Sequence, residues 1–402
     1  MSDECWLISV TAGRWQVHGI QQAMKAGLKV LAIDSDCSAP GLSIADIGLC
    51  LSLDNHASVV SAVTAQGKCF AGVVSFASEA GMPLAAYLRV ALGLKGPDAL
   101  LTNSLLNKVS QRKAWDRFGV PSVKWCSYTD SRAALVALQN ADFPCIVKPA
   151  DSSGSRGVTK IESIQDNLAD AIERAFQFAK SSEILIESFM EGTEFTVETF
   201  AEGGCFHVLA VTEKKKVKGT RSTVASELAS PARPVEVIDK ITSVVVSAYR
   251  ALGYREGPGH AEIILGNDGR VGLIEVAGRG GGFMVFDRLV PAISGYNIAR
   301  ATALQAVGLA VEPVSANRKS AVLRFFPSRP GILRSITGFD EANRINGVEA
   351  DTFVKVGSSF KHAIADADRM GYILAVSDQP FEAQELADRA ESSIHFQIEA
   401  TN

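Results

Sequence analysis

The stretch from Gly259 to Arg279 constrains the fold more than any other part of the sequence. It contains a Gly-Asn-Asp-Gly turn signal at Gly266–Gly269, with a β-forming apolar run on either side. This pattern predicts a β-hairpin. Because side chains alternate along a strand, the hairpin must place some polar residues of its two arms on a common face.

The expected register of this hairpin brings two carboxylates together. With Leu265 paired to Arg270, Glu262 and Glu275 become diagonal neighbours on one face, roughly 7–8 Å apart at Cα. The same register puts His260 opposite Glu275. Two acids in an apolar hairpin repel each other and lose solvation unless a cation lies between them. The hairpin therefore predicts a Mg²⁺ site, and Mg²⁺ held by one or two carboxylates usually also binds phosphates.

Length and composition narrow the class of protein. The chain has 402 residues, enough for two or three domains, with 47% hydrophobic and 21% charged residues, which is typical of a globular protein. A net charge of −4 gives no reason to expect nucleic acid as a partner. No apolar run reaches membrane-spanning length, and the first residues carry acids where a signal peptide has bases. The seven scattered cysteines are interpreted as reduced, mostly buried thiols, so we expect a cytoplasmic protein without membrane contact.

The first hundred residues alternate between strand and helix patterns. Strands are expected at Trp6–Val10, Lys29–Ile33 and Gly72–Phe76, with helices at Val17–Ala26 and Met82–Leu92. A β-α-β pattern of this kind predicts a parallel sheet covered by helices. The first strand-to-helix turn lacks the G-x-G-x-x-G fingerprint of dinucleotide-binding folds, which argues against a nicotinamide-dependent oxidoreductase.

The middle of the chain carries basic residues and a glycine-rich loop. A helix is expected over Ser104–Phe118, and Lys108 and Arg112 share one of its faces, which on the helix alone suggests a solvated basic face. A short strand ends at Lys148, and the small residues of Ala150–Gly157 follow. Such a loop lets backbone N–H groups approach a polyanion, although a flexible surface turn has the same composition.

Further elements complete the middle and the end of the chain. A helix is expected over Ser163–Lys180, a strand over Glu183–Phe189 and a long helix over Val235–Leu252. The basic run Lys214–Lys218 lacks interleaved aromatic residues, so we interpret it as a mobile loop rather than a nucleic-acid site. From about Ala316 a small α+β unit follows.

Taken in order, these segments resemble the ATP-grasp superfamily of carboxylate–amine ligases. The segments that carry the resemblance are N-K-V-S-Q-R-K at Asn107, I-V-K-P-A-D-S-S-G-S-R-G-V from Ile146, I-E-S-F-M-E-G-T-E-F-T-V-E from Ile186, and H-A-E-I…L-I-E-V-A-G-R from His260. The ending E-V-A-G-R-G-G-G is most similar to bacterial L-amino-acid ligases that make dipeptides. The resemblance covers essentially the whole chain.

The resemblance implies a fold, a reaction and a cofactor. The fold class is α/β with α+β lobes: a pre-ATP-grasp parallel α/β domain at 1–102, a two-lobed ATP-grasp domain at 103–316, and a small α+β cap like that of biotin carboxylase at 317–402. The reaction is ATP-dependent activation of a carboxylate as an acyl phosphate, followed by attack of an amine. ATP and Mg²⁺ are the implied cofactors, with Mn²⁺ as an alternative ion. The implied partners are a small-molecule carboxylate and amine, and a homodimer is the expectation from base rates.

The resemblance also implies the role of individual residues. Metal ligands are Glu262 and Glu275, and Arg279 lies beside the acyl phosphate. His260 is a candidate base for the amine, with an orienting role as the alternative. The nucleotide-binding set comprises the phosphate lysines Lys108 and Lys148, the flap residues Ser152, Ser153, Gly154, Ser155 and Gly157, the hinge residues Glu187, Ser188, Phe189 and Met190, and the ribose ligand Glu194.

One position departs from the family pattern. Many relatives have E-x-N-P-R, with the asparagine as a third metal ligand, and this chain has Ala277 and Gly278 instead. Water can fill a Mg²⁺ coordination position, so the departure leaves the number of metal ions open. Two other functions stay open: a purine-pathway type of enzyme that activates formate or bicarbonate, and a nucleotide-binding module without catalysis.

Overall fold

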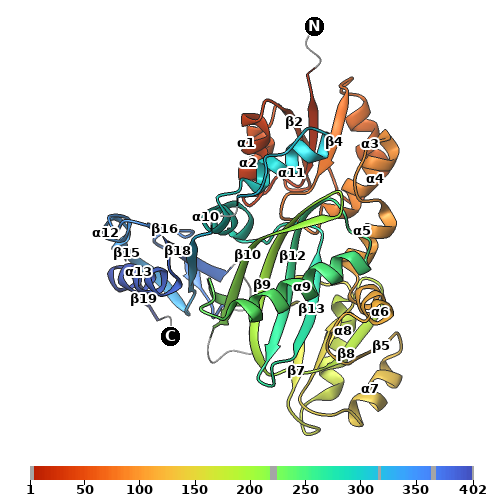
Figure 1. The fold of residues 1–402 in the computed structure, drawn as a ribbon, viewed down its shortest axis with the longest axis vertical. Coiled ribbons are helices and arrows are strands. Elements are labelled where there is room, and N and C mark those ends of the chain that lie inside the picture. The colour runs from red at the N-terminus through yellow and green to blue at the C-terminus, as the bar shows by residue number, and fades with distance from the viewer. Residues whose placement is uncertain (1–3, 218–223, 316–317, 364–367, 401–402) are drawn as a thin grey trace.

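The computed structural model describes residues 4–217, 224–315, 318–363 and 368–400. Its first sheet lies at the top of Figure 1 and has the order β3-β2-β1-β4, with parallel neighbours. This confirms the parallel β-α-β prediction for the N-terminal region. The strands are β1 (Trp6–Val10), β2 (Lys29–Asp34), β3 (Ile47–Cys50) and β4 (Phe70–Val74), with helices α1 (Val17–Lys25), α2 (Pro40–Ile44), α3 (His56–Thr64) and α4 (Met82–Leu92).

The helix expected over Ser104–Phe118 is two helices in the structure, α5 (Ala99–Leu106) and α6 (Lys108–Phe118). They separate at Asn107, which has extended backbone angles and whose side chain accepts a hydrogen bond of 2.8 Å from Ser110 N. The single-helix prediction is therefore wrong, because an asparagine competes for backbone N–H groups and starts a new helix.

A small antiparallel sheet follows, at the bottom right of Figure 1, in the order β5-β8-β6-β7. The helix expected from Ser163 begins only at Leu168, because Asn167 caps it by accepting a hydrogen bond from Asp170 N. The elements are β5 (Trp125–Tyr128), α7 (Ser131–Gln139), β6 (Cys145–Pro149), β7 (Thr159–Ile161), α8 (Leu168–Phe178) and β8 (Ile184–Ser188).

An eight-stranded sheet forms the centre of the molecule and continues into the C-terminal region, in the order β13-β12-β9-β10-β11-β14-β18-β16. The long helix α9 (Val235–Ala251) crosses β9, β12 and β13 in Figure 1, and Ile241, Val245, Ala248 and Tyr249 are buried in the core between them. The strands are β9 (Gly192–Glu202), β10 (Cys205–Lys216), β11 (Ala225–Ala229), β12 (Gly257–Gly266), β13 (Val271–Ala277), β14 (Ser320–Pro327), β16 (Val348–Thr352) and β18 (Arg369–Ser377).

After β13 the chain returns to the N-terminal region. A π-helix, η1 (Val285–Leu289), leads into α10 (Val290–Ser294) and α11 (Ile298–Ala306), and α11 packs beside α1 and β4. The backbone of Ala306 lies so close to Gly72 that a Cβ there would meet its carbonyl oxygen at 2.3 Å. The predicted first and second domains are therefore in direct backbone contact at β4 and the end of α11.

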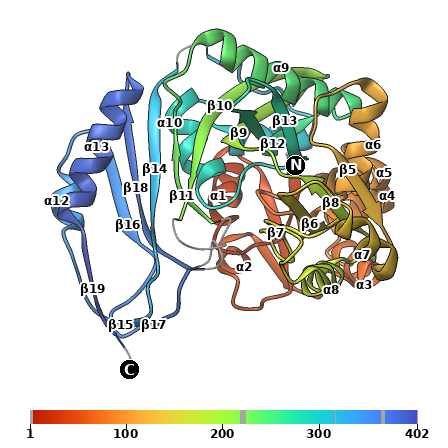
Figure 2. The same ribbon diagram turned by 90° about the horizontal axis from the view of Figure 1, so that it is seen from below.

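The C-terminal region adds a second layer, seen at the left of Figure 2. Helix α13 (Pro380–Ser393) packs on β18 and β14, and a three-stranded sheet has the order β17-β15-β19. The β11–β14 pairing makes the central sheet continuous across the predicted boundary at 316/317, and residues 316 and 317 themselves lie outside the described residues. The remaining elements are α12 (Phe339–Asn343), β15 (Gly331–Thr337), β17 (Ser359–Phe360) and β19 (His395–Glu399).

The cysteine interpretation needs correction. Cys37 and Cys50, near the ends of β2 and β3, form a disulfide with a Cα–Cα distance of 5.0 Å. Of the free thiols, only Cys145 is buried, whereas Cys69, Cys126 and Cys205 are exposed. Widely spaced cysteines can meet when neighbouring parallel strands end at the same edge of a sheet, and sequence spacing alone does not reveal this.

In the parts of the chain that the structure describes, no helix combines the length and the apolar character needed to cross a membrane.

Candidate active site

The hairpin β12–β13 exists, but its register differs from the expected one. Leu265 pairs with Val271, and Glu262 lies directly opposite Glu275 rather than diagonal to it. His260 lies opposite Ala277, not opposite Glu275. The turn is one residue longer than assumed, and a bulge between Glu262 and Ile263 shifts the register by one more residue. The two carboxylates are thus closer neighbours than the sequence predicted, since directly opposed residues are about 4.5–5.5 Å apart.

Each of these carboxylates contacts one lysine. Lys108 Nζ lies 2.9 Å from Glu275 Oε2, and Lys214 Nζ lies 2.9 Å from Glu262 Oε1. Lys214 also lies 2.6 Å from Glu194 Oε1, so it bridges the predicted ribose ligand and a predicted metal ligand. Lys214 belongs to β10, and the mobile-loop interpretation is therefore wrong for Lys214–Lys216. Residues 218–223, including the end of that run, lie outside the described residues.

Lys108 joins three parts of the site. Its side chain reaches Glu275 and also donates a hydrogen bond of 2.9 Å to Ser152 O in the glycine-rich loop. Its backbone N–H donates to Ala150 O at 2.7 Å. Burial by itself lowers the pKa of Lys108, but the carboxylates of Glu275 and Glu79 outweigh it and hold that pKa above the ordinary value. Lys108 therefore stays charged beneath the loop.

The helix face of Lys108 and Arg112 is buried, so the solvated-face interpretation is wrong. Arg112 is fully buried, and its Nη2 lies 2.8 Å from Glu187 Oε1 and donates to Ile274 O at 2.6 Å. Ile274 is the residue that the bulge in β13 leaves without a strand partner. The guanidinium thus satisfies a backbone carbonyl that the sheet does not.

Glu187 is held through its side chain by two cations. Its carboxylate lies between Arg112 and Lys148, whose Nζ is 2.6 Å from Glu187 Oε2. Burial lowers the pKa of Lys148 even though Glu187 opposes that effect. Burial makes the charged form of Lys148 costly, and a bound anionic group would reduce that cost. Lys148 is therefore well suited to bind an anion.

The glycine-rich loop is anchored at both ends and exposed at its tip. Gly154, Ser155 and Gly157 have positive φ, and the strain at Ser155 is tolerated where the chain reverses between β6 and β7. A Cβ at Gly157 would meet Pro149 Cγ at 2.8 Å, so glycine is required at that end. Ser152 and Ser153 lie half-buried at the other end, while Gly154 and Ser155 are exposed.

The predicted hinge has one backbone N–H group, that of Met190, for which the described residues provide no backbone acceptor. Ser188 N donates to Lys124 O, and Phe189 N donates to Pro144 O. Within the described residues no backbone hydrogen bond is found for Met190 N–H. The Met190 side chain lies over the hairpin, close enough that a Cβ at Gly272 would meet its Sδ at 2.7 Å.

Two acidic residues that the sequence prediction missed complete the site. Glu198 is buried, contacts His260 Nδ1 and accepts a hydrogen bond of 3.1 Å from Gly281 N. Burial lowers the pKa of His260, but Glu198 outweighs it and the pKa rises to about 9. Glu194 and Glu198 share a face of β9, so their spacing in T-E-F-T-V-E was an available signal.

The second missed residue is Glu79, which follows β4 and forms an ion pair with Arg279. Burial lowers the pKa of Arg279, but the carboxylate of Glu79 outweighs this effect and holds that pKa above its ordinary value. Arg279 also donates to Gly280 O at 2.9 Å. Parallel sheets bind ligands just beyond the carboxyl ends of their strands, and Glu79 lies at such a place after β4. This position was the only sequence signal that Glu79 belongs to the candidate site.

The donor set suits a divalent cation that also binds phosphate. Glu262 and Glu275 supply hard oxygen ligands, and their present partners are ammonium groups, which shows that both carboxylates attract positive charge. Among the residues that the structure describes, no group of three or more His, Cys, Asp or Glu could hold a metal ion. Two carboxylates leave several Mg²⁺ positions for phosphate oxygens and water.

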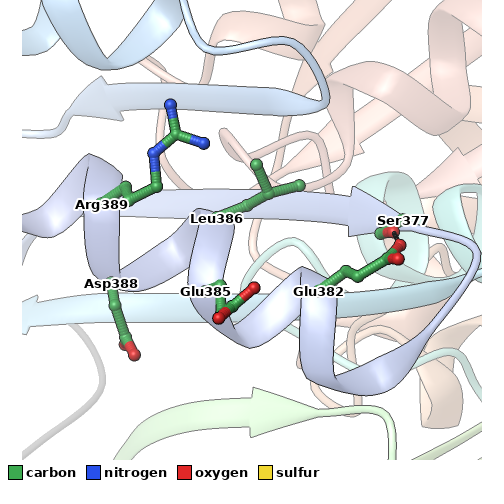
Figure 3. A pocket seen from close by; sticks show the side chains of 6 residues that line it. All are labelled: Ser377, Glu382, Glu385, Leu386, Asp388 and Arg389. Carbon is green, nitrogen blue, oxygen red and sulfur yellow. Dashed lines mark hydrogen bonds between the residues drawn. The ribbon is translucent and has the colours of Figure 1, made fainter.

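A separate hollow of about 540 Å³ lies along α13 and is shown in Figure 3. None of the predicted site residues lines it. Its lining consists of Ser377, Glu382, Glu385, Leu386, Asp388 and Arg389.

Two family models match the chain. One describes the ATP-grasp domain and matches residues 141–287, and the other describes the L-amino acid ligase C-terminal domain 2 and matches residues 324–399. Residues 141–287 therefore form an ATP-grasp domain. The second model then adds that the C-terminal region of the chain is of the L-amino acid ligase type.

Individual relatives agree with this assignment. An uncharacterized protein of Sinorhizobium fredii is 28% identical over 83% of this chain and 70% of its own length. A D-alanine–D-alanine ligase of Acidovorax ebreus is 27% identical over 52% of this chain and 64% of its own length. A formate-dependent phosphoribosylglycinamide formyltransferase of Ignicoccus hospitalis is 26% identical over 92% of this chain and 90% of its own length.

A solved structure shares the entire fold. The L-amino acid ligase from Bacillus licheniformis superposes with a TM-score of 0.83, covering 99% of this chain and 100% of the other, at 22% identity. The expected ATP-grasp fold is thereby confirmed.

Proposed function

We propose that the protein activates a carboxylate as an acyl phosphate with ATP and joins it to an amine, with an amino acid as one substrate. The observation that carries the proposal is the pairing of Glu262 with Glu275 between Lys108 and Lys214. Carboxylate is a poor electrophile, and phosphorylation converts it into a group that an amine can attack. The released products are ADP and phosphate.

Nucleotide binding is assigned to one side of this pair. Lys108 and Lys148 neutralise phosphate charge, and the Ser152–Gly157 loop covers it. Glu194 takes the ribose, and the hinge Glu187–Met190 meets the adenine through the Met190 N–H. Mg²⁺ on Glu262 and Glu275 would supply charge neutralisation for phosphoryl transfer when bound, and Mn²⁺ has the same ligand preference. This assignment predicts that the two lysines lose their carboxylate contacts when the nucleotide binds.

The amide-forming step is assigned to the other side. Arg279 would hold the negative charge that develops when the amine attacks the acyl phosphate. His260 has a raised pKa and a buried carboxylate partner, which favours an orienting role over that of a general base, since a protonated imidazole accepts no proton. Enclosure of the site is needed to keep the acyl phosphate from water.

The division at 102/103 and 316/317 remains a proposal, as do the cytoplasmic location and the homodimer. Neither nucleic acid nor a membrane is needed for this reaction.

A second candidate function is activation of formate or bicarbonate, because a formate-dependent transferase aligns with most of the chain. The match of residues 324–399 to an L-amino acid ligase domain favours the amino acid reaction. In the transferase reaction the activated acid is very small, so the two functions differ in the size of the carboxylate that supports turnover.

The test measures ADP and phosphate release from MgATP with pooled amino acids and small carboxylates, followed by mass spectrometry. The expected product is lighter than the sum of two pool members by one water. Turnover supported only by formate or bicarbonate would favour the second function. Release of AMP and pyrophosphate would contradict the acyl-phosphate mechanism.

A further inference from the structure

A hollow of about 500 Å³ lies where three regions of the chain meet. One wall is α1 of the N-terminal sheet, the second is η1 with α10, and the third is β16 with β18. Figure 1 shows α10 between the N-terminal sheet and the C-terminal strands. None of the residues assigned to ATP or metal lines this hollow, which includes His18, Gln22, Asp287, Arg288, Asn297 and Glu349 among its polar residues.

The charges in this hollow are not matched in tight pairs. Arg288 Nε lies 3.7 Å from Glu349 Oε1, and both side chains are nearly half exposed. Glu349 already accepts a hydrogen bond of 2.6 Å from Tyr372 Oη. In the described part of the chain no ion pair is found for Asp287, and its carboxylate is hydrogen-bonded only to its own backbone. The carboxyl group of Asp287 and the guanidinium of Arg288 can therefore each form a closer ion pair with a bound ligand.

The chemistry of Asp287 indicates what that partner is. Burial raises the pKa of its carboxyl group to about 6, because the charge of the neighbouring Arg288 lowers that pKa by too little to offset the lost solvation. His18 lies on the α1 wall of the hollow. Burial lowers the pKa of His18, and the charges of Arg288 and Lys25 lower it further. An ammonium group beside Asp287 would provide the missing compensation.

The rest of the lining is apolar. Pro291, Val348, Leu374 and Val376 contribute aliphatic surface to it. A ligand that fits all of these features carries an ammonium group, a carboxylate and an aliphatic side chain. The volume is ample for one amino acid.

The hollow is connected to the site through a strained segment. Asp287 and Arg288 lie on the π-helix η1, which begins after Met284. Phe283 and Met284 have φ of 46° and 69°, values that such residues rarely adopt. π-Helices and strained residues cluster at functional sites. Eight positions separate Arg279 from Asp287, so a shift of η1 acts directly on the segment that follows Arg279.

We propose that this hollow is a second, non-catalytic binding site for an aliphatic α-amino acid, whose ammonium group binds Asp287 and whose carboxylate binds Arg288. Occupancy holds η1 in one position and thereby modulates the reaction at Arg279. The site is defined by its own residues and goes beyond the proposed ligase activity.

The test is calorimetric titration of L-leucine into the full chain without ATP, using wild type, Asp287→Asn and Arg288→Gln. The analogues 4-methylpentanoate, which lacks the ammonium group, and 3-methylbutylamine, which lacks the carboxylate, are titrated in parallel. Arg344→Gln is the matched control, because Arg344 is an exposed arginine that does not line the hollow.

The expected pattern assigns each charge separately. Asp287→Asn weakens L-leucine at one binding event by tenfold or more but leaves 4-methylpentanoate unchanged. Arg288→Gln weakens L-leucine and 4-methylpentanoate but leaves 3-methylbutylamine unchanged, and Arg344→Gln changes nothing. Identical isotherms in all variants, or no L-leucine binding by wild type at millimolar concentration, would overturn the proposal. Neither outcome depends on ATP turnover, so failure here is distinct from failure of the proposed ligase function.

Discussion

Arg279 forms an ion pair with Glu79, although the two residues are 200 positions apart in the sequence. Arg279 follows the hairpin of the central sheet, and Glu79 follows β4 of the N-terminal sheet. The contact places an acid from the first hundred residues beside the arginine assigned to the acyl phosphate. The N-terminal region therefore contributes a side chain to the candidate site.

This pair leads to the first prediction. Glu79→Gln keeps the size of the side chain but removes the charge that orients Arg279. We expect kcat for amide formation to fall about 10- to 100-fold, corresponding to roughly 1.4–2.7 kcal/mol, while ATP affinity stays within twofold. Steady-state kinetics and nucleotide titration measure the two effects. Asp268→Asn, which removes the exposed partner of Arg270, is the control and should change neither value.

The second prediction concerns the paired carboxylates. Glu275→Gln removes a proposed metal ligand and leaves Lys108 without its carboxylate. We expect ATP turnover to fall by at least about 1000-fold, because the phosphates lose the Mg²⁺ that this carboxylate would hold. EDTA should abolish turnover in wild type, with recovery on added Mg²⁺. Turnover of the variant close to that of wild type would contradict the assignment of the metal site.

Some of these features could be predicted from the sequence, and some could not. The hairpin, the β-α-β region and the acids Glu262 and Glu275 follow local patterns of period two and of turn residues. The predicted register was wrong because the turn is one residue longer and because β13 has a bulge at Ile274, whose carbonyl accepts a hydrogen bond from Arg112, on a helix more than 150 positions earlier. Contacts of that kind leave no trace in local spacing.

The same reason explains why Arg112 was taken for a solvated residue. Its helix has an amphipathic pattern that alone does not distinguish a basic face in water from one that is buried against acids. Only the small sheet, which brings Glu187 within 2.8 Å, decides between them. Glu79 and Glu198 were missed for a related reason: each gains its partner from another part of the fold.

The third prediction concerns the buried network of Arg112, Lys148 and Glu187. Arg112→Met leaves Glu187 with one cation and the carbonyl of Ile274 with no donor. We expect the free energy of unfolding to fall by about 3–5 kcal/mol, because a buried charge loses a partner. Urea unfolding monitored by circular dichroism measures it. Arg117→Met, at an exposed position of the same helix, is the control and should cost less than about 0.5 kcal/mol.

The same network has a pH dependence with a defined sign. Burial raises the pKa of Glu187, but Arg112 and Lys148 outweigh it and the net pKa lies below the ordinary value of 4.5. Because the folded-state pKa is depressed, the stabilisation is present above about pH 4.5 and is lost as pH falls through the folded-state value. In Arg112→Met the acid transition should move to higher pH. An unchanged transition would mean that Glu187 stays ionised through Lys148 alone.

The last prediction concerns Asp287, whose pH dependence has the opposite sign. Its pKa is raised by burial from 3.8 to about 6, so between these values the folded state binds more protons than the unfolded state. Stability must therefore fall as pH rises from about 4 to 6, and the cost persists above pH 6. Asp287→Asn removes an ionisable group from this position, so the variant should be more stable than wild type at pH 7 and closer to it at pH 4. Urea unfolding at both pH values measures the difference, and Asp268→Asn, whose exposed carboxylate has a lowered pKa, is the control in which no such gain appears. Added L-leucine at pH 7 should reduce the advantage of Asp287→Asn, because a bound ammonium group stabilises the ionised carboxylate of wild type alone.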